Sequence, residues 1–271
     1  MLETDATHDP ARRSFIETAN LARADFPLQN LPFGIFRRAG EKVGRGGVAI
    51  GDQIFDLPAA RDAGLFSGLA EKAAGAASEP KLNALMALGN RAASSLRARL
   101  CNLLDASGSD RKKVEAMAGR LFVPMSQAVM ELPTAVGNFT DFLTSSFHSQ
   151  RLAPSGQVAA NFKSMPIAYH SRASSVRVSG ETIRRPHGQW LDEARMPHFG
   201  PSRALDYELE LGAFIGRGNA LGEPIPLEDA SQHVFGFCLL NDWSARDVQR
   251  WESAPLGPFL AKSLSTSISP W

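Results

Sequence analysis

The sequence has 271 residues, of which 44% are hydrophobic and 21% are charged, and its formal net charge at pH 7 is +1. This composition is typical of a globular protein with one large domain or two smaller ones. A net charge so close to zero gives no electrostatic reason to expect binding to nucleic acid or to a membrane surface, and no apolar run approaches the roughly 20 residues of a membrane span. Cys101 and Cys238 have apolar neighbours and no CxxC spacing, which favours reduced core residues in a cytoplasmic protein.

The first part of the chain carries signals for both strands and helices. Residues 31–36 and 47–57 are short apolar stretches bounded by glycines, and Gly51-Asp52 has the composition of a hairpin turn. Leucines at helical spacing predict a helix over residues 79–105, and residues 112–120 also favour a helix. We therefore expect a small mixed α/β unit that ends near residue 120 and contains no cluster of chemically useful groups.

From Leu121 onward, prolines separate short apolar runs, which is typical of short strands and structured loops. Residues 173–184 read as a hairpin, and residues 204–216 and 233–240 read as strands. The last of these apolar runs ends abruptly at Asn241-Asp242, and an amphipathic polar segment follows. A carboxylate that lies where a buried strand ends and a helix begins is held rigidly, so we expect chemistry at this point.

The strand expected over residues 204–216 alternates between apolar and acidic side chains. With a period of two, Asp206, Glu208 and Glu210 share one face. Glu208 and Glu210 would lie about 7 Å apart along that face, close enough to converge on a cation. The plain alternative is a solvated strand face. Acidic residues form strands poorly, however, and three of them on one face indicate a bound counter-ion.

Asp242 and Asp141 can each be interpreted either as a helix N-cap or as a metal ligand. Asp242 follows a strand, which is also a common position for a helix N-cap. Thr140 or Asp141 could cap a helix that runs through His148, which would put Asp141 and His148 on one face about 10 Å apart. Four carboxylates without a metal-binding pattern of cysteine or histidine suit a hard cation such as Ca²⁺ or Mg²⁺ better than Zn²⁺. The G-x-S-x-G and H-E-x-x-H motifs are absent from the sequence, and His170 is more simply a structural histidine.

Eight segments of this sequence resemble the fumarylacetoacetase family, whose members catalyse the last step of tyrosine breakdown. The segments follow the order of the family across nearly the whole chain. They are LPFGIF at 31–36, VAIGDQIFDL at 48–57, NFTDF at 138–142, PIAYHSRASSVRVSGETIRRPHGQ at 166–189, LDYELELGAFIGRGNALGEPIP at 205–226, VFGFCLLNDWSARDVQRWE at 234–252, PLGPFLAKS at 255–263 and SISPW at 267–271.

The resemblance implies a mixed α+β fold that is mainly β. A small N-terminal SH3-like barrel domain would occupy residues 1–120, and a mixed β-roll catalytic domain would occupy residues 121–271. Members of the family work as homodimers. They also continue well beyond the position that matches Trp271, so we expect this sequence to lack the C-terminal part of the catalytic domain.

The resemblance also implies a reaction and a set of site residues. The reaction is the metal-dependent hydrolysis of a carbon–carbon bond in a β-diketone acid, with Ca²⁺ or Mg²⁺ as the cofactor. In the family, fumarylacetoacetate gives fumarate and acetoacetate. The catalytic positions match His148, Lys262 and Arg246; the substrate positions match Tyr169, Gln249, Leu143 and Ser253; and the metal positions match Asp141, Glu208, Glu210, Asp242, Lys262 and Thr266.

This sequence departs from the family around the substrate. Leu143 and Ser253 stand where the family usually has tyrosine, and Ser171 replaces a glycine. No arginine aligns cleanly with the one that grips the substrate carboxylate, although Arg151 is nearby. The metal positions are kept while the substrate positions differ, so we expect altered specificity or reduced activity. The alternatives are an acylpyruvate-type hydrolase or a decarboxylase of the same superfamily, or a metal-binding remnant without turnover.

Overall fold

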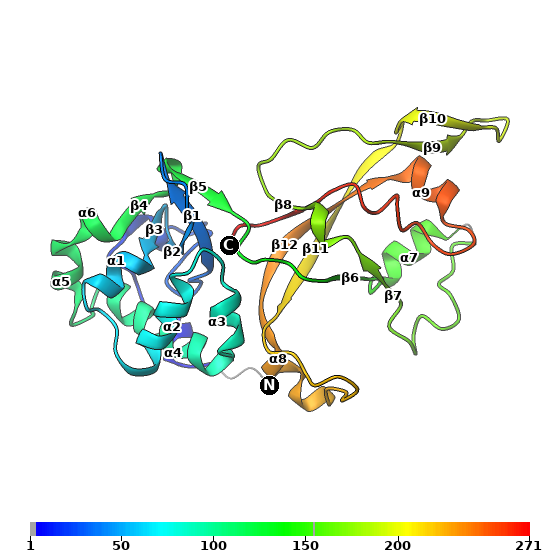
Figure 1. Cartoon of the computed structure of the whole chain (residues 1–271). Coiled ribbons are helices and arrows are strands. Elements are labelled where there is room, and N and C mark those ends of the chain that lie inside the picture. The colour runs from blue at the N-terminus through cyan, green and yellow to red at the C-terminus, as the bar shows by residue number, and fades with distance from the viewer. Residues whose placement is uncertain (1–3, 154) are drawn as a thin grey trace. The chain divides into compact units, whose positions relative to one another are not determined.

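The computed structural model describes residues 4–153 and 155–271 and divides into two compact units (Figure 1). The first unit comprises Met1–Ala135, Leu211–Leu239 and Ser269–Trp271, and the second comprises Val136–Glu210 and Leu240–Ile268. The fold is mixed α+β. In the described part of the chain, no helix is both long enough and apolar enough to cross a membrane.

An antiparallel five-stranded sheet forms the centre of the first unit. Its strands, in the order β4-β3-β2-β1-β5, are β4 (Phe122–Pro124), β3 (Gln53–Asp56), β2 (Arg45–Ile50), β1 (Phe33–Arg38) and β5 (Ala128–Glu131). The hairpin expected at Gly51-Asp52 is confirmed, since it joins β2 to β3. Gly51 has a φ of 56°, and a Cβ there would lie 2.2 Å from the hydroxyl of Thr18, so the turn needs glycine.

Helices cover this sheet and supply most of the core. The helix expected over residues 79–105 is present as two helices, α3 and α4, because Gly89 adopts a φ of 80° between them. The short α1 and the alanine-rich α2 were not expected, since alanines give a weaker apolar pattern than leucines. These helices are α1 (Leu57–Asp62), α2 (Gly68–Ala77), α3 (Asn83–Ala87), α4 (Asn90–Leu104), α5 (Arg111–Ala116) and α6 (Ala118–Leu121). The first unit also includes α8 (Ala230–His233), which lies between β11 and β12 in the sequence.

The core of the first unit lies between the helices and the sheet. Leu96 and Leu100 of α4 and Ile35 and Phe55 of the sheet are fully buried. Burial of a side chain of this size stabilises the folded state by about 1.5–3 kcal/mol. β4 and β5 belong to this unit although they follow residue 120. The domain boundary at 120/121 stays a prediction.

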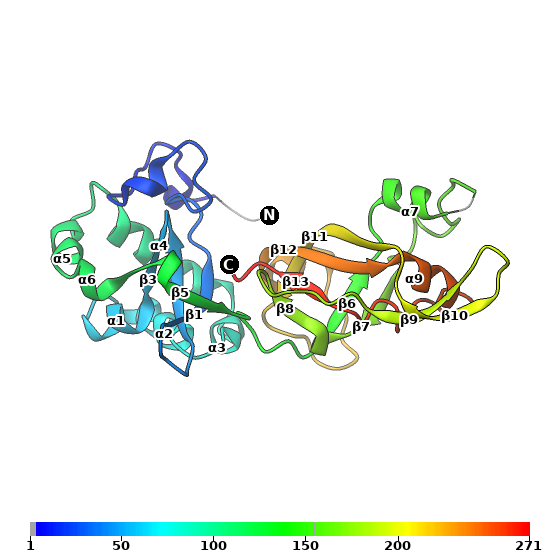
Figure 2. The ribbon, with the colours of Figure 1, turned by 90° about the horizontal axis from the view of Figure 1, so that it is seen from above.

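Short ladders and one four-stranded sheet make up the strands of the second unit. β6 (Phe139–Phe142) pairs with β7 (Ala168–Ser171), and β9 (His187–Leu191) pairs with β10 (Pro197–Pro201). The larger sheet has the order β11-β12-β13-β8, and its strands can be followed in this order in Figure 2. Its strands are β11 (Leu205–Ile215), β12 (Val234–Ala245), β13 (Thr266–Ile268) and β8 (Val176–Val178). β11 and β12 extend into the first unit.

Two helices of the second unit follow strands directly or closely: α7 (Ser146–Leu152) and α9 (Arg246–Glu252). Short 3₁₀ turns complete the described structure at Ala6–His8, Glu17–Asn20, Met125–Gln127, Ala173–Ser175 and Leu227–Asp229. β11 confirms the strand expected over residues 204–216, and α9 confirms the helix expected after Asp242.

Three local expectations are wrong. Residues 173–184 do not form a hairpin, because β8 pairs in parallel with β13, which is distant in the sequence. Asp242 is not an N-cap, since β12 continues through it and Ala245 is the N-cap of α9. Asp141 lies within β6, and Ser145 caps the helix that carries His148.

Candidate metal centre

Three carboxylates meet on one face of the four-stranded sheet. Glu208 and Glu210 are two residues apart on β11, and Asp242 lies on the neighbouring β12. One oxygen from each lies within 4.8 Å of the other two. The expected alternation along β11 is confirmed. Tyr207 and Leu209 are exposed, however, while Glu208 and Glu210 are half-buried, and of the three acidic residues only Asp206 is exposed. A solvated acidic face is therefore excluded for this pair.

Asp141 approaches the three carboxylates from a separate ladder. In the pairing of β6 with β7, Asp141 lies opposite Tyr169, whose hydroxyl donates to Asp141 Oδ2 at 2.5 Å. Burial, this hydrogen bond and the charge of Asp141 all raise the pKa of Tyr169, so the phenol stays protonated. The charge of Asp141 also acts on Glu210 and Asp242. The structure thus brings all four expected carboxylates to one region.

Lys262 is the buried cation of the site. Its Nζ donates to Glu208 Oε2 at 2.8 Å and to the hydroxyl of Ser244 at 2.7 Å, and it also forms an ion pair with Asp242. The residue is 4% exposed. A charge at this depth is tolerated only when it is paired and hydrogen-bonded. Thr266 is buried too and lies opposite Asp242 in the ladder of β12 and β13.

Glu208 is also the meeting point of a guanidinium and an imidazole. Arg246 Nη1 lies 2.8 Å from Glu208 Oε1, and His148 Nε2 lies 3.0 Å from the same oxygen. Burial alone would raise the pKa of Glu208, but the positive charges of Lys262 and Arg246 outweigh it and lower the pKa to about 2. Glu208 therefore stays ionised at neutral pH.

At the other two carboxylates, the positive charge of Lys262 does not outweigh the effect of burial on the pKa. Burial, strengthened by the negative charges of Asp141, Asp242 and Glu208, raises the pKa of Glu210 to about 8. Burial also raises the pKa of Asp242 to about 7, despite its contact with Lys262. Asp242 Oδ1 is buried, and no hydrogen-bond partner for it is found among the described residues.

These features fit a divalent cation. The donors are all oxygens, as hard cations such as Ca²⁺ and Mg²⁺ require. An unpartnered buried carboxylate oxygen is costly unless another group binds it, and the raised pKa values of Glu210 and Asp242 reflect an excess of negative charge that a cation would relieve.

The expected substrate residues lie in different settings. Gln249 Oε1 accepts a hydrogen bond from Arg246 at 3.1 Å, which links it to the site. Ser253 is exposed, and its hydroxyl donates to the carbonyl of Gln249. Leu143 is half-buried, and its N–H donates to the carbonyl of Ile167. Tyr169 donates directly to Asp141, and Gln249 is linked to the carboxylates through Arg246, whereas no such hydrogen bond is described for the side chains of Leu143 and Ser253.

The sequence did not single out three supporting residues. Ser244 is two residues after Asp242 on β12, so period-two alternation could have placed its hydroxyl on the same face. Asp206 was placed on the acidic face, but its ion pair with Arg246 at 2.9 Å was not expected. Glu252 accepts hydrogen bonds from the loop that carries Lys262, and no local pattern announces that contact.

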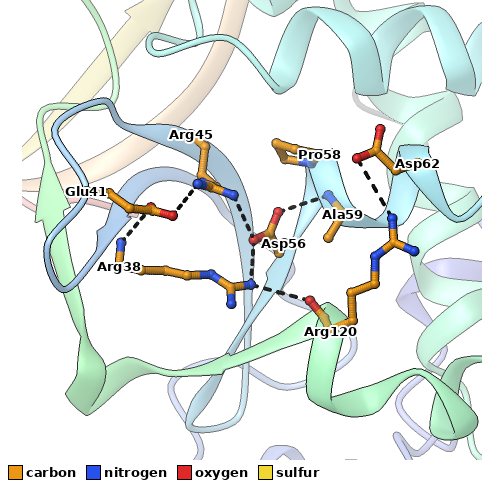
Figure 3. A pocket seen from close by; sticks show the side chains of 8 residues that line it. All are labelled: Arg38, Glu41, Arg45, Asp56, Pro58, Ala59, Asp62 and Arg120. Carbon is orange, nitrogen blue, oxygen red and sulfur yellow. Dashed lines mark hydrogen bonds and ion pairs between the residues drawn. The ribbon is translucent and has the colours of Figure 1, made fainter.

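A second group of charges lies in the first unit, where no such cluster was expected (Figure 3). The buried carboxylate of Asp56 accepts from the N–H of Ala59 at the start of α1 and from Arg38 at 2.9 Å. Arg45 pairs with Glu41. These contacts surround a pocket of about 290 Å³. Because its inner carboxylates are already paired, we assign the cluster a structural role at the corner between β3 and α1.

The pKa values of Glu210 and Asp242 predict an unusual pH dependence for the metal-free protein. Their pKa values rise on folding from 4.5 to about 8 and from 3.8 to about 7. The folded state thus holds more protons than the unfolded state across this window, so stability falls as the pH rises from about 5 to 8. We expect the Tm, measured in chelator at each pH, to fall by several degrees over this range.

The matched measurements are the same series with Ca²⁺ and with Glu210→Gln. Both should flatten the pH dependence, because the cation replaces the protons and the amide does not ionise. A Tm that rises between pH 5 and 8 in chelator would contradict the assignment of these two carboxylates.

Comparison with known proteins covers both parts of the chain. Residues 29–133 match the family described as Fumarylacetoacetase N-terminal, and residues 139–271 match the family described as Fumarylacetoacetate (FAA) hydrolase C-terminal. Among curated proteins, a fumarylacetoacetase of Oryza sativa subsp. japonica is 46% identical over 269 residues, which is 96% of this chain. Those of Rattus norvegicus and Homo sapiens are 45% and 43% identical over 265 residues, or 95% of this chain.

The chain spans 62% of the length of each of these three relatives. Among solved structures, the fumarylacetoacetate hydrolase of Exiguobacterium antarcticum aligns with a TM-score of 0.50 and 18% identity. That alignment covers 87% of this chain and 62% of the solved one. At this identity the likeness concerns the fold alone.

Proposed function

Because this chain belongs to the fumarylacetoacetate hydrolase family, we propose that it carries the metal centre of a hydrolase that cleaves a carbon–carbon bond in a β-diketone acid. The proposed reaction converts fumarylacetoacetate to fumarate and acetoacetate in the breakdown of tyrosine and phenylalanine. The observation that supports this most directly is the convergence of Glu208, Glu210 and Asp242 within 4.8 Å, together with a buried oxygen of Asp242 for which the described residues supply no hydrogen-bond partner.

In this proposal four carboxylates hold Ca²⁺ or Mg²⁺: Asp141, Glu208, Glu210 and Asp242. Lys262 and Thr266 complete the surroundings of the metal. When bound there, a divalent cation would supply Lewis-acid stabilisation of the negative charge that develops on the leaving group. The protein's own share is to keep Glu208 ionised, through Lys262 and Arg246, and to hold the carboxylates in a fixed arrangement.

His148 is the proposed general base. Its Nε2 lies 3.0 Å from Glu208 Oε1, at the edge of the carboxylate cluster. Because Glu208 is ionised, the Nε2–H group donates to it, and Nδ1 of the neutral imidazole is the nitrogen that can take a proton from a water molecule. The oxygen of that water would add to the adjacent carbonyl carbon, the carbon–carbon bond would break, and the imidazolium would return the proton to the carbon of the leaving group. Proton transfer by a positioned side chain contributes about 10²–10⁴-fold to such a reaction.

Lys262 and Arg246 are the proposed electrostatic groups. Both already contact Glu208, and both stay positively charged at neutral pH, since contacts with carboxylates raise the pKa of each despite burial. Fixed cations stabilise negative charge that grows in the transition state. Tyr169 and Gln249 would contact the substrate, with Leu143 and Ser253 on its outer side.

The finer features of the family complete the proposal. We assign residues 1–120 to an SH3-like barrel domain and residues 121–271 to a mixed β-roll catalytic domain, and we expect a homodimer in the cytoplasm. The support for these features is the similarity to fumarylacetoacetases along 95–96% of the chain.

One assay tests the reaction. Purified protein is mixed with fumarylacetoacetate, and the loss of diketone absorbance is followed with Ca²⁺, with Mg²⁺ and with chelator. We expect turnover with a divalent cation and at least about 100-fold less in chelator, since the metal stabilises the leaving group by several kcal/mol. Calorimetry with each cation serves as the control that the site binds metal.

An acylpyruvate is the second substrate in this assay, because Leu143 and Ser253 replace tyrosines of the family. Faster turnover of the acylpyruvate than of fumarylacetoacetate would show that the protein is an acylpyruvate-type hydrolase instead. Metal binding without turnover of either substrate would contradict the hydrolase and leave a metal-binding remnant.

A further inference from the structure

A carboxylate of α9, that of Glu252, accepts hydrogen bonds from the backbone of the loop that leads to Lys262. Glu252, the last residue of α9, accepts the N–H of Leu260 at 2.8 Å with one oxygen and the N–H of Ala261 at 2.6 Å with the other. Both N–H groups come directly before Lys262 in the chain. A carboxylate that accepts two backbone N–H groups forms strong, charge-assisted hydrogen bonds, so Glu252 fixes the backbone from which the lysine extends.

The helix that carries Glu252 is itself anchored at both ends. At its start, Asp247 accepts hydrogen bonds from the hydroxyl of Ser202 at 2.7 Å and from the N–H of Arg203 at 2.6 Å. Near its end, Trp251 Nε1 donates to Gln189 Oε1 on β9 at 2.6 Å. These contacts hold α9 in place, and the hydrogen bonds of Glu252 hold the loop in a fixed position relative to α9.

The same helix begins with Arg246. Arg246 and Lys262 contact different oxygens of Glu208, Oε1 and Oε2. Their relative placement therefore depends on α9 at one end and on the loop of residues 253–261 at the other. Several residues of that loop are exposed, whereas Ala261 and Lys262 are buried. The side chain of Lys262 is held by Glu208, Asp242 and Ser244, whereas Glu252 hydrogen-bonds the backbone at the buried end of the loop and joins it to α9.

We propose that Glu252 is a positioning residue that sets Lys262 against Glu208 and Asp242. Its effect on turnover rests on the proposed function above, whereas its effect on the loop does not. Misplacement of a reacting or charge-stabilising group by about 1 Å can lower a rate by about 100-fold, so a residue that touches no substrate can still control the reaction.

The test compares Glu252→Gln with Glu193→Gln, a control at an exposed glutamate of the same unit. Glutamine keeps the length of the side chain but replaces one acceptor oxygen with an amide NH₂, so in the present geometry one of the two N–H groups loses its acceptor, and the other loses the negative charge of its acceptor. In Glu252→Gln, amide hydrogen exchange at Leu260 and Ala261 should be about tenfold faster or more. Acetylation of Lys262, read by mass spectrometry, should accelerate as well. The control should change neither.

Two further measurements separate positioning from general structural damage. Calorimetric affinity for Ca²⁺ should fall by no more than about 10- to 100-fold, the loss expected when a support of the metal ligands moves, because the carboxylate ligands themselves are untouched. Where the protein turns over substrate, kcat should fall by about 10- to 100-fold. In a Lys262→Met background, Glu252→Gln should add almost nothing, since residues that act through one another are not additive.

Unchanged exchange and acetylation in Glu252→Gln would overturn the proposal, as would an equal loss of kcat in both backgrounds. If the unaltered protein shows no turnover, the hydrolase fails. The exchange and acetylation data still decide the role of Glu252.

Discussion

Asp242→Asn is expected to weaken the binding of Ca²⁺ or Mg²⁺ by more than about 100-fold and to abolish metal-dependent turnover. Loss of residues that merely support metal ligands costs 10- to 100-fold in affinity, and Asp242 is placed as a ligand. Its Oδ1 is buried and unpartnered, so the asparagine would keep the shape of the site while removing the negative charge. Calorimetry with each cation measures the affinity directly.

Two further variants serve as controls for Asp242→Asn. Asp25→Asn, at an exposed aspartate of the first unit, should leave the affinity unchanged. Because Asp242 also pairs with the buried Lys262, the substitution can destabilise the fold. Glu210→Gln removes a ligand without breaking a described ion pair and should lose affinity in a folded protein, as circular dichroism can verify. Full affinity in folded Glu210→Gln and Asp242→Asn would rule out a metal site here.

His148→Ala is expected to lower turnover by about 10²–10⁴-fold, the usual contribution of a general base, while the affinity for the cation changes by less than about threefold. The imidazole contacts Glu208, which is a proposed ligand, but it lies outside the group of converging oxygens. Initial rates at saturating cation, together with calorimetry, give both numbers for the same preparation.

His8→Ala is the matched control, since His8 also has a ring nitrogen 3.0 Å from an aspartate oxygen but lies in the first unit. A large loss of cation affinity in His148→Ala would make the histidine a ligand or a support of the ligands. Unchanged turnover in His148→Ala would show that His148 is not the general base.

The acidic site could be predicted to the extent that it depends on local patterns. Alternation along residues 204–216 placed Glu208 and Glu210 on one face, and β11 confirms it. The sequence could not show that this face is the buried one, because Tyr207 and Leu209 are the residues that a core would ordinarily bury. The cost of burying carboxylates in place of apolar groups is itself a sign of function.

The errors arose where pairing joins distant segments. The segment 176–178 has the composition of a hairpin strand, but its partner is β13 near the end of the chain. Asp141 has a neighbourhood that suits either a helix cap or a strand, and only its pairing with Tyr169 across β7 decides between them. The contact of Glu252 with Leu260 and Ala261 depends on a loop whose path no local propensity determines.

The two ladders that carry the proposed ligands differ in how firmly they are built. Glu208, Glu210 and Asp242 belong to a sheet of four strands, whereas Asp141 belongs to a pair of strands, and a two-stranded ladder is only marginally stable by itself. The position of Asp141 would therefore vary more than the positions of the other three carboxylates, and the ladder of β6 and β7 would determine how rigidly the fourth proposed ligand is held.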